Sequence, residues 1–256
     1  FKYFSFIMSL AFLFPGQGSQ SVGMGADLFE RFSDLVCEAD ELLGYSLRSL
    51  CLDDPDVKLG RTEYTQPALY VVSYLHALSL IEDGLRPSLS AGHSVGEFAA
   101  LASAGSIGFA DGLQMVAKRG EIMSQVEGGG MAAVIGLDAD VIRETLSSVS
   151  LADIDLANFN SPGQIVVSGP ADQIKEIIVP LKAAGAKLVV PLKVSGAFHS
   201  RMMEQPALQF KEFLGSFSFS QPQIPVYSNV EAQPYADAET IPSILVRQIH
   251  SPVRWS

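Results

Sequence analysis

Cysteine is nearly absent from this sequence, which has only Cys37 and Cys51 among its 256 residues. Their separation does not fit the C-x-x-C spacing of redox pairs and zinc sites. We therefore expect both to be buried free thiols of a protein in the reducing cytoplasm. The sequence also lacks low-complexity tracts and long internal repeats, so a globular fold must come from ordinary strands and helices.

Basic residues are scarce as well: 17 Lys and Arg stand against 28 Asp and Glu, which gives a formal net charge of −11. The sequence pI is about 4.7. This charge argues against nucleic acid and against an anionic membrane surface as partners, because both are themselves negatively charged.

No hydrophobic run is long enough to span a membrane. The apolar run at residues 4–14 lacks the small-x-small cleavage site of a signal peptide and continues directly into a glycine-containing loop. We expect this run to be the first buried strand, with Met8 as the native start and residues 1–7 as upstream sequence.

The order of the hydrophobic segments predicts an α/β fold. Strands and helices alternate through the first half, which predicts a parallel sheet with helices on both faces. After residues 127–130 the order becomes βαββαβ, typical of a ferredoxin-like unit, with strands expected at 131–137, 154–159, 164–168 and 186–194 and helices at 138–148 and 170–185. We expect a larger α/β-hydrolase-like domain (1–130 and 195–256) with an inserted ferredoxin-like small domain (131–194). The active site would lie in the cleft between them.

Residues 92–97, GHSVGE, fit the G-x-S-x-G pattern of a serine on a sharp turn between a strand and a helix. Such a turn lifts the Ser94 hydroxyl clear of the sheet and places backbone N–H groups where an oxyanion develops. An apolar segment at 87–91 and a helix-forming one at 98–102 flank it. The pattern alone fits an ordinary Gly/Ser turn equally well. Whether Ser94 is a nucleophile must therefore be judged from other residues.

A nucleophilic serine needs a base, and the sequence has only four histidines. His93 adjoins Ser94 on the tight turn, where neighbouring side chains diverge. His76 lies in an apolar helical run and His250 at a predicted helix end. His199 follows a strand and a loop of small residues, a frequent catalytic placement, so it is the favoured base. No Asp or Glu stands out as the third member of a catalytic triad. A carbonyl group could orient the imidazole equally well.

The apolar segment at 12–14 leads into a loop with two glycines, Gly16 and Gly18. The loop has neither the third glycine of a dinucleotide site nor G-K-[ST], which disfavours phosphate binding. Glycine allows the backbone to approach a ligand closely. A backbone N–H near Gln17 is therefore expected to be the second oxyanion donor.

These pieces, in this order, resemble the malonyl-CoA:acyl carrier protein transacylases over residues 10–255. The matching motifs are FPGQGSQ (14–20), TQPALY (65–70), GHSVGE (92–97), KRGEIM (118–123), NSPGQIVVSG (160–169), GAFHS (196–200) and SPVRW (251–255). Each motif is weak by itself, but the ordered set is very specific. Residues 50–72 are most similar to the free-standing acyltransferases that serve polyketide synthase modules in trans.

The resemblance implies catalytic roles for five residues. Ser94 would be the acyl-accepting nucleophile and His199 its general base. The backbone N–H groups of Gln17 and Val95 would form the oxyanion hole. The backbone carbonyl of Gln248 would orient the imidazole of His199.

The resemblance also implies an acyl pocket. Arg119 would hold the malonyl carboxylate, and a planar guanidinium suits that task on chemical grounds alone. Phe198 belongs to the malonyl form of the motif, and its ring would crowd the added methyl group of methylmalonyl. One methyl group in a pocket usually changes the free energy of binding by only about 1–3 kcal/mol, so a preference for malonyl is expected and not absolute exclusion. In malonyl-specific acyltransferase domains of larger proteins, a histidine is frequent at the position of Gly196. The glycine leaves more space beside Phe198. Further residues at positions that line the pocket in this family are His93, Gln66 and Asn160.

The implied reaction is ping-pong transfer of a malonyl group from malonyl-CoA through Ser94 to the phosphopantetheine thiol of an acyl carrier protein. It needs no metal and no cofactor, and a monomer is expected. Carrier proteins are usually acidic, so a local cationic patch would have to dock them; the candidates are Lys182, Lys187, Lys193 and Arg201. Because family members usually continue for a few dozen residues, a C-terminal helix is expected to be missing.

Two other functions compete with transfer. The same serine and histidine could hydrolyse acyl groups from carrier proteins, but such hydrolases generally lack the carboxylate-binding arginine, which this chain has as Arg119. The chain could also be a non-catalytic scaffold that binds carriers. Intact Ser94 and His199 argue against a scaffold.

Overall fold

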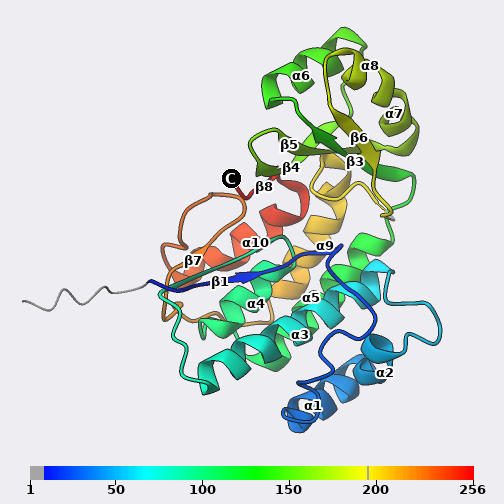
Figure 1. Cartoon of the computed structure of the whole chain (residues 1–256). Coiled ribbons are helices and arrows are strands. Elements are labelled where there is room, and N and C mark those ends of the chain that lie inside the picture. Colours follow the sequence, from blue (N-terminus) through cyan, green and yellow to red (C-terminus); the bar gives the residue numbers. More distant parts are fainter. Residues whose placement is uncertain (1–8, 195) are drawn as a thin grey trace, which may run out of the picture.

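The computed structural model describes residues 9–194 and 196–256. These residues form two units, a larger helical one and a smaller one, and each unit contains its own β-sheet (Figure 1). The expected start at Met8 and the first part of the expected strand at residues 4–14 lie outside the described residues. In the described part, no helix combines the length and apolar character that a bilayer span requires.

A three-stranded sheet lies at the centre of the larger unit, in the order β1 (Ala11–Phe14), β2 (Leu89–Gly92), β7 (Val226–Tyr227). Both pairings are parallel, as the sequence predicts. Phe12 and Phe14 are buried under helices, whereas Leu13 on the opposite face is 62% exposed. The prediction of helices on both faces is therefore wrong at β1, where the described residues leave one face open. The four apolar residues of this strand gave no alternation that could have shown it.

Helices surround the covered face of this sheet (Figure 1). α3 is buried on most sides and is the central helix of the unit, as its nearly continuous apolar sequence requires. The helices of the unit are α1 (Ser33–Leu43), α2 (Leu47–Leu52), α3 (Thr62–Glu82), α4 (Gly96–Ser103), α5 (Phe109–Ser124), α9 (Glu204–Leu214) and α10 (Ile241–His250), with short 3-10 turns at Arg201–Met203 and Ala238–Thr240.

The smaller unit has the predicted βαββαβ order and a ferredoxin-like sheet. Its antiparallel strands lie in the spatial order β6-β3-β5-β4, with helices on one face (Figure 1). The strands are β3 (Gly129–Ile135), β4 (Asp155–Ser161), β5 (Gln164–Pro170) and β6 (Leu188–Pro191). The helices are α6 (Ala139–Ser148), α7 (Ala171–Glu176) and α8 (Ile178–Ala183).

Three details differ from the sequence-based expectations. The helix expected at 170–185 is divided at Ile177 into α7 and α8; Pro180 has no N–H to donate to the carbonyl four residues earlier, which favours the break. A short strand, β8 (Val253–Arg254), joins β4 in parallel and extends the small sheet. Cys37 is exposed, because α1 buries Val36 and Ala39 instead, whereas Cys51 is buried as expected.

The turn between β2 and α4 depends on two glycines. A Cβ atom on Gly92 would lie 1.9 Å from the carbonyl carbon of Gly96, and one on Gly96 would lie 2.5 Å from the carbonyl oxygen of Phe14. All these neighbours are backbone atoms, which cannot move aside as a flexible side chain can. The G-x-S-x-G spacing is therefore a packing requirement of this turn.

We expect Gly92→Ala to destabilise the protein by about 3 kcal/mol or more, because the added methyl group overlaps the backbone of Gly96 and Glu97 at the start of α4. Urea unfolding would measure the change. Gly60→Ala is the matched control: no heavy atom would lie within 4 Å of its Cβ, so its effect should stay within about 1 kcal/mol. Similar stabilities for the two variants would contradict the packing argument.

Candidate active site

Ser94 occupies the sharp turn that the sequence predicts between β2 and α4. Its φ of 51° lies in the left-handed region, a conformation that costs of order 1–3 kcal/mol and needs support from its surroundings. Asn229 gives that support: its Oδ1 accepts a hydrogen bond from the Ser94 N–H at 2.6 Å, and its Nδ2 donates to the Gly92 carbonyl at 2.7 Å. The side chain of Ser94 is consequently held above the end of the sheet.

His199 is the histidine that reaches this serine. Its Nε2 lies 2.8 Å from Ser94 Oγ, and its Nδ1 lies 2.8 Å from the Gln248 carbonyl and 3.2 Å from that of Ser251. Both neighbours of Nδ1 are acceptors, so Nδ1 carries the proton and Nε2 is free to accept one from the serine. Ser94 and His199 therefore form a Ser–His dyad. Backbone carbonyl groups occupy the place that a carboxylate has in a Ser–His–Asp triad.

The environment of His199 keeps the imidazole neutral. Burial, followed by the nearby positive charge of Arg119, lowers its pKa to about 3. A neutral imidazole can accept the serine proton, so the dyad is poised for nucleophilic attack at neutral pH.

Arg119, on α5, is fully buried and points at the same hydroxyl. Its Nη2 donates to Ser94 Oγ at 3.1 Å and to Gln248 Oε1 at 3.0 Å, and its Nη1 donates to Gln66 Oε1 at 2.7 Å. Burial lowers its pKa to about 10, so it stays charged at pH 7. Among the described residues no carboxylate forms an ion pair with it, and its Nε has no hydrogen-bond partner. A buried cation without an anion beside a nucleophile suits an anionic substrate.

The backbone N–H groups of Gln17 and Val95 are the oxyanion donors expected from the sequence. Val95 immediately precedes α4, and the loop that contains Gln17 contacts the turn, because the His93 N–H donates to the Phe14 carbonyl at 2.9 Å. In residues 9–194 and 196–256, neither the Gln17 nor the Val95 N–H has a protein acceptor. Both are available to an oxyanion.

The other predicted site residues are distributed around this centre. Gln66 contacts Arg119 directly, as described above. His93 Nε2 lies 2.9 Å from Asn160 Oδ1, which connects the serine turn to β4 of the small sheet. The ring of Phe198 is buried, and it lies close to Gly196, where a Cβ would approach it to 3.2 Å.

Sequence reasoning missed two residues of this centre, Asn229 and Glu97. Asn229 follows β7, and the carboxyl ends of parallel strands meet at one edge of a sheet, so the polar residues after Val226–Tyr227 were a signal. Glu97 is fully buried within the serine motif itself. Burial raises its pKa to about 7, while hydrogen bonds from Tyr235, Gln248 and Asn229 and the charge of Arg119 oppose the shift.

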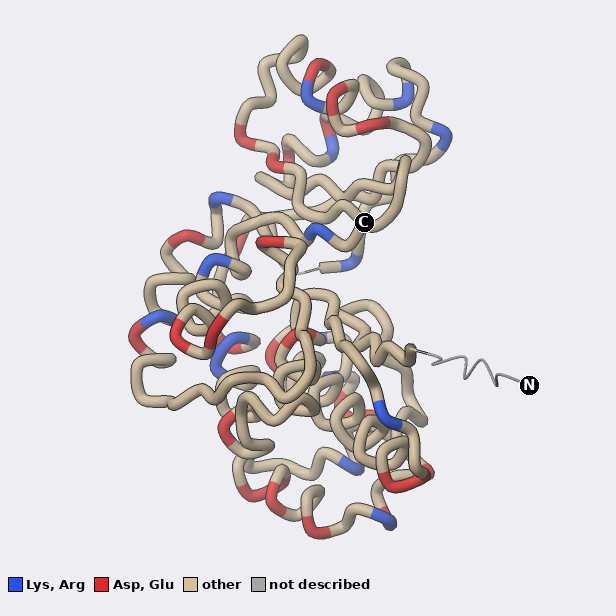
Figure 2. The backbone as a smooth tube through the Cα atoms, turned by 90° about the vertical axis from the view of Figure 1, so that its left-hand side faces the viewer, with Lys and Arg blue, Asp and Glu red and all other residues tan. Residues whose placement is uncertain are grey.

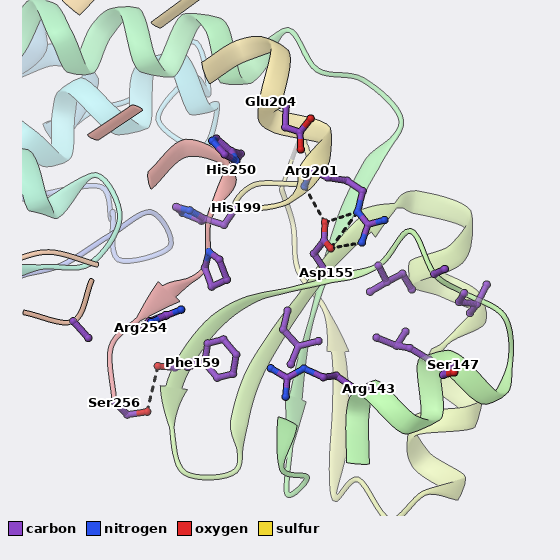
Figure 3. A pocket seen from close by; sticks show the side chains of 17 residues that line it. Arg143, Ser147, Asp155, Phe159, His199, Arg201, Glu204, His250, Arg254 and Ser256 are labelled. Atoms are coloured by element: carbon purple, nitrogen blue, oxygen red, sulfur yellow. Dashed lines mark hydrogen bonds and ion pairs between the residues drawn. The ribbon is translucent and has the colours of Figure 1, made fainter. Parts of the chain in front are cut away.

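A cleft of about 970 Å³ lies between the two units and reaches His199 (Figure 3). Phe159 and Asp155 on β4 line one side, and His199 and His250 line the other. Arg201 crosses it and forms an ion pair with Asp155 at 2.6 Å. Of the reactive residues, His199 lines this cleft. The described residues contain no group of three or more His, Cys, Asp or Glu that could hold a metal ion.

Comparison with known proteins assigns the chain to a family. The sequence model described as "Acyl transferase domain" matches residues 11–256. The chain belongs to this family. This acyl transferase domain is 51% identical over 246 residues to the polyketide biosynthesis protein ThaF of Burkholderia thailandensis, covering 96% of the chain but 21% of ThaF. It is also 49% identical to the polyketide biosynthesis malonyl CoA-acyl carrier protein transacylase BaeC of Bacillus velezensis, covering 96% of the chain and 86% of BaeC.

Solved structures confirm the fold of this acyl transferase domain. The crystal structure of a malonyl CoA-acyl carrier protein transacylase from Burkholderia pseudomallei superposes with a TM-score of 0.94 at 47% identity, covering 97% of this chain and 85% of the other. The larger α/β unit with a parallel sheet and the ferredoxin-like unit are therefore a shared architecture.

The low pKa of His199 makes a direct prediction for the acyl transferase domain. Imidazole resonances of His199, assigned by their loss in His199→Ala, should keep neutral-form NMR shifts from pH 8 down to about pH 5, because the folded-state pKa lies well below the ordinary value. A midpoint near pH 6.5 would show that neither burial nor the Arg119 charge acts on the ring.

Proposed function

We propose that this acyl transferase domain moves a malonyl group from malonyl-CoA to the phosphopantetheine thiol of an acyl carrier protein. The observation that carries the proposal is the buried guanidinium of Arg119, which lies 3.1 Å from Ser94 Oγ without a carboxylate partner of its own. Malonyl differs from acetyl by a carboxylate, and this guanidinium has the charge and the flat geometry to receive one. BaeC and the protein from Burkholderia pseudomallei are both malonyl CoA-acyl carrier protein transacylases by name.

In the first half-reaction, Ser94 Oγ attacks the thioester carbonyl while its proton moves to His199 Nε2. The oxyanion receives hydrogen bonds from the N–H groups of Gln17 and Val95. The C–S bond then breaks, and the CoA sulfur leaves with the proton from His199. The products are free CoA and a malonyl ester on Ser94.

The second half-reaction reverses these steps with a different thiol. The phosphopantetheine sulfur gives its proton to His199 and attacks the ester carbonyl, and Ser94 Oγ leaves and takes the proton back. The bound carboxylate offsets the charge of Arg119, which otherwise lowers the pKa of His199. A malonyl substrate therefore makes its own base stronger, whereas an acetyl group does not.

Further residues shape the pocket. Gln66 anchors Arg119 through Nη1, and the carbonyl of Gln248 fixes the tautomer of His199. His93 and Asn160, which hydrogen-bond to each other, form the wall toward the small sheet. Phe198 lies next to His199 in sequence and disfavours a methyl branch at C2, so methylmalonyl should react more slowly without being excluded.

The biological setting is part of the proposal. The enzyme acts in trans on polyketide synthase modules, as a cytoplasmic monomer that needs neither metal nor cofactor. Its large domain comprises 1–130 and 195–256, and its small domain 131–194. Acidic residues are spread along the described part of the backbone with Lys and Arg among them (Figure 2), and Arg201 is paired with Asp155. Docking of an acidic carrier therefore falls to the remaining candidates, Lys182, Lys187 and Lys193.

Hydrolysis is less well supported than transfer. A hydrolase of unsubstituted acyl groups would gain nothing from a buried guanidinium at the nucleophile, and burying Arg119 is costly. A carrier-binding scaffold would need neither the dyad nor this charge.

Intact-protein mass spectrometry after mixing with malonyl-CoA, methylmalonyl-CoA or acetyl-CoA tests the function. We expect a malonyl adduct to form fastest, to map to Ser94 and to move to an added carrier protein; Ser94→Ala should form none. Accumulation of free malonate and CoA without an adduct would favour hydrolysis. An adduct that persists on Ser94→Ala would point to another nucleophile.

The role of Arg119 can be tested against its neighbour. Arg119→Ala should slow malonyl loading by about 100-fold or more, as expected for loss of a buried charged partner, and acetyl loading far less. Lys118→Ala is the matched control, because Lys118 is partly exposed and paired with Glu121; it should load both groups normally. An equal loss of malonyl and acetyl loading in Arg119→Ala would contradict the carboxylate role.

A further inference from the structure

Glu97 is a buried carboxylate that the reaction above does not use. It has no exposed surface and lies at the start of α4, three positions after Ser94. Its Oε2 accepts hydrogen bonds from Gln248 Nε2 at 2.5 Å and from the Asn229 N–H at 3.2 Å, and its Oε1 accepts one from the Tyr235 hydroxyl. A carboxylate with this many donors is held in one orientation, and it fixes its donors in return.

The first consequence concerns the side-chain amide of Gln248. Its Nε2 donates to Glu97 Oε2 and to the Ser94 carbonyl at 3.0 Å, so the nitrogen must face these two acceptors. Its Oε1 therefore faces the other way, toward Arg119 Nη2 at 3.0 Å. The orientation is required, because a guanidinium has only donors and could not accept from Nε2.

The second consequence is that Glu97 influences Arg119 without neutralising it. The carboxylate is separated from the guanidinium by the amide of Gln248, and no direct ion pair forms between them in the described residues. A direct ion pair would occupy the donors that an acyl carboxylate needs. The Gln248 amide fixes the orientation of the Arg119 guanidinium, but it does not neutralise the charge that a substrate carboxylate would bind.

We propose that Glu97 is a positioning residue that determines acyl-group specificity: it fixes the Gln248 amide, and through it the Arg119 guanidinium, for a substrate carboxylate. The inference rests on the proposed function, since it concerns how the same pocket recognises a malonyl group. The groups that face Glu97 are Arg119 from α5, Gln248 from α10, and Asn229 and Tyr235 from the segment between β7 and α10.

Glu97→Leu removes both acceptor oxygens at a similar side-chain size. A glutamine would not do so, because its amide oxygen could still accept from Gln248 Nε2 while its NH2 group donates to the Tyr235 hydroxyl. In Glu97→Leu the Gln248 amide loses the acceptor that fixes it, and Arg119 consequently loses a well-oriented acceptor on the Nη2 side. Acetyl has no carboxylate and relies only on the dyad and the oxyanion donors, so the ratio of malonyl to acetyl loading should report the change.

The experiment measures single-turnover loading of malonyl and acetyl groups by intact-protein mass spectrometry for the wild type, Glu97→Leu, Gln248→Leu and the double variant. Glu97→Leu and Gln248→Leu should each lower the malonyl-to-acetyl ratio by about tenfold. Leucine removes only the amide of residue 248 and keeps the backbone carbonyl that binds His199. Because Glu97 acts through Gln248, the double variant should have the ratio of Gln248→Leu alone.

Tyr235→Phe is the matched control, since it removes a hydrogen bond from the other carboxylate oxygen, away from Gln248; its ratio should stay within about twofold of the wild type. Equal losses of both loading rates in Glu97→Leu, or effects that multiply in the double variant, would overturn the inference. If Glu97→Leu does not fold, an unchanged ratio in Gln248→Leu overturns it equally. A wild type without any malonyl preference overturns the proposed function and this inference together.

Discussion

A positive charge buried beside the nucleophile is the constraint on which the rest of the site depends. Arg119 has no exposed surface, yet its pKa of about 10 keeps it charged. Its two terminal nitrogens donate to the amide oxygens of Gln66 and Gln248, and the carboxyl group of Glu97 lies one amide further away. Amide oxygens accept hydrogen bonds without cancelling charge, so the site is stable enough to fold and still attracts an anion. This compromise explains why two glutamines, and no acidic residue, surround the guanidinium.

The same charge sets the behaviour of the dyad. It helps to keep His199 neutral, and His199 must be neutral to act as a base. The carbonyls of Gln248 and Ser251 replace the usual carboxylate of a triad at Nδ1. A carboxylate at Nδ1 would compete with the substrate for the nearby guanidinium, whereas a carbonyl fixes the tautomer without adding charge. The residues come from segments as far apart as α4 and α10, which meet at the carboxyl ends of the parallel strands.

Much of the fold and of the candidate site was predictable from sequence, because it depends on residues that are close together in the chain. The serine turn, the small-residue loop before His199 and the βαββαβ order each depend on neighbours in the chain. The break at Ile177, the two-residue strand β8 and the open face at β1 were not predicted, since short or uniformly apolar segments carry no periodicity. Asn229 supports Ser94 across 135 residues, and Glu97 is tied to Gln248 across 151. Hydrogen bonds of such separation have no sequence signature of their own.

The pairing of β8 with β4 limits how the two units can move. Ser251 holds the imidazole of His199, and Val253, two residues later, is already part of the small sheet opposite Asn158. A hinge rotation that opened the cleft would therefore pull on the carbonyl that orients the base. The orientation of the base is consequently tied to the relative position of the two units.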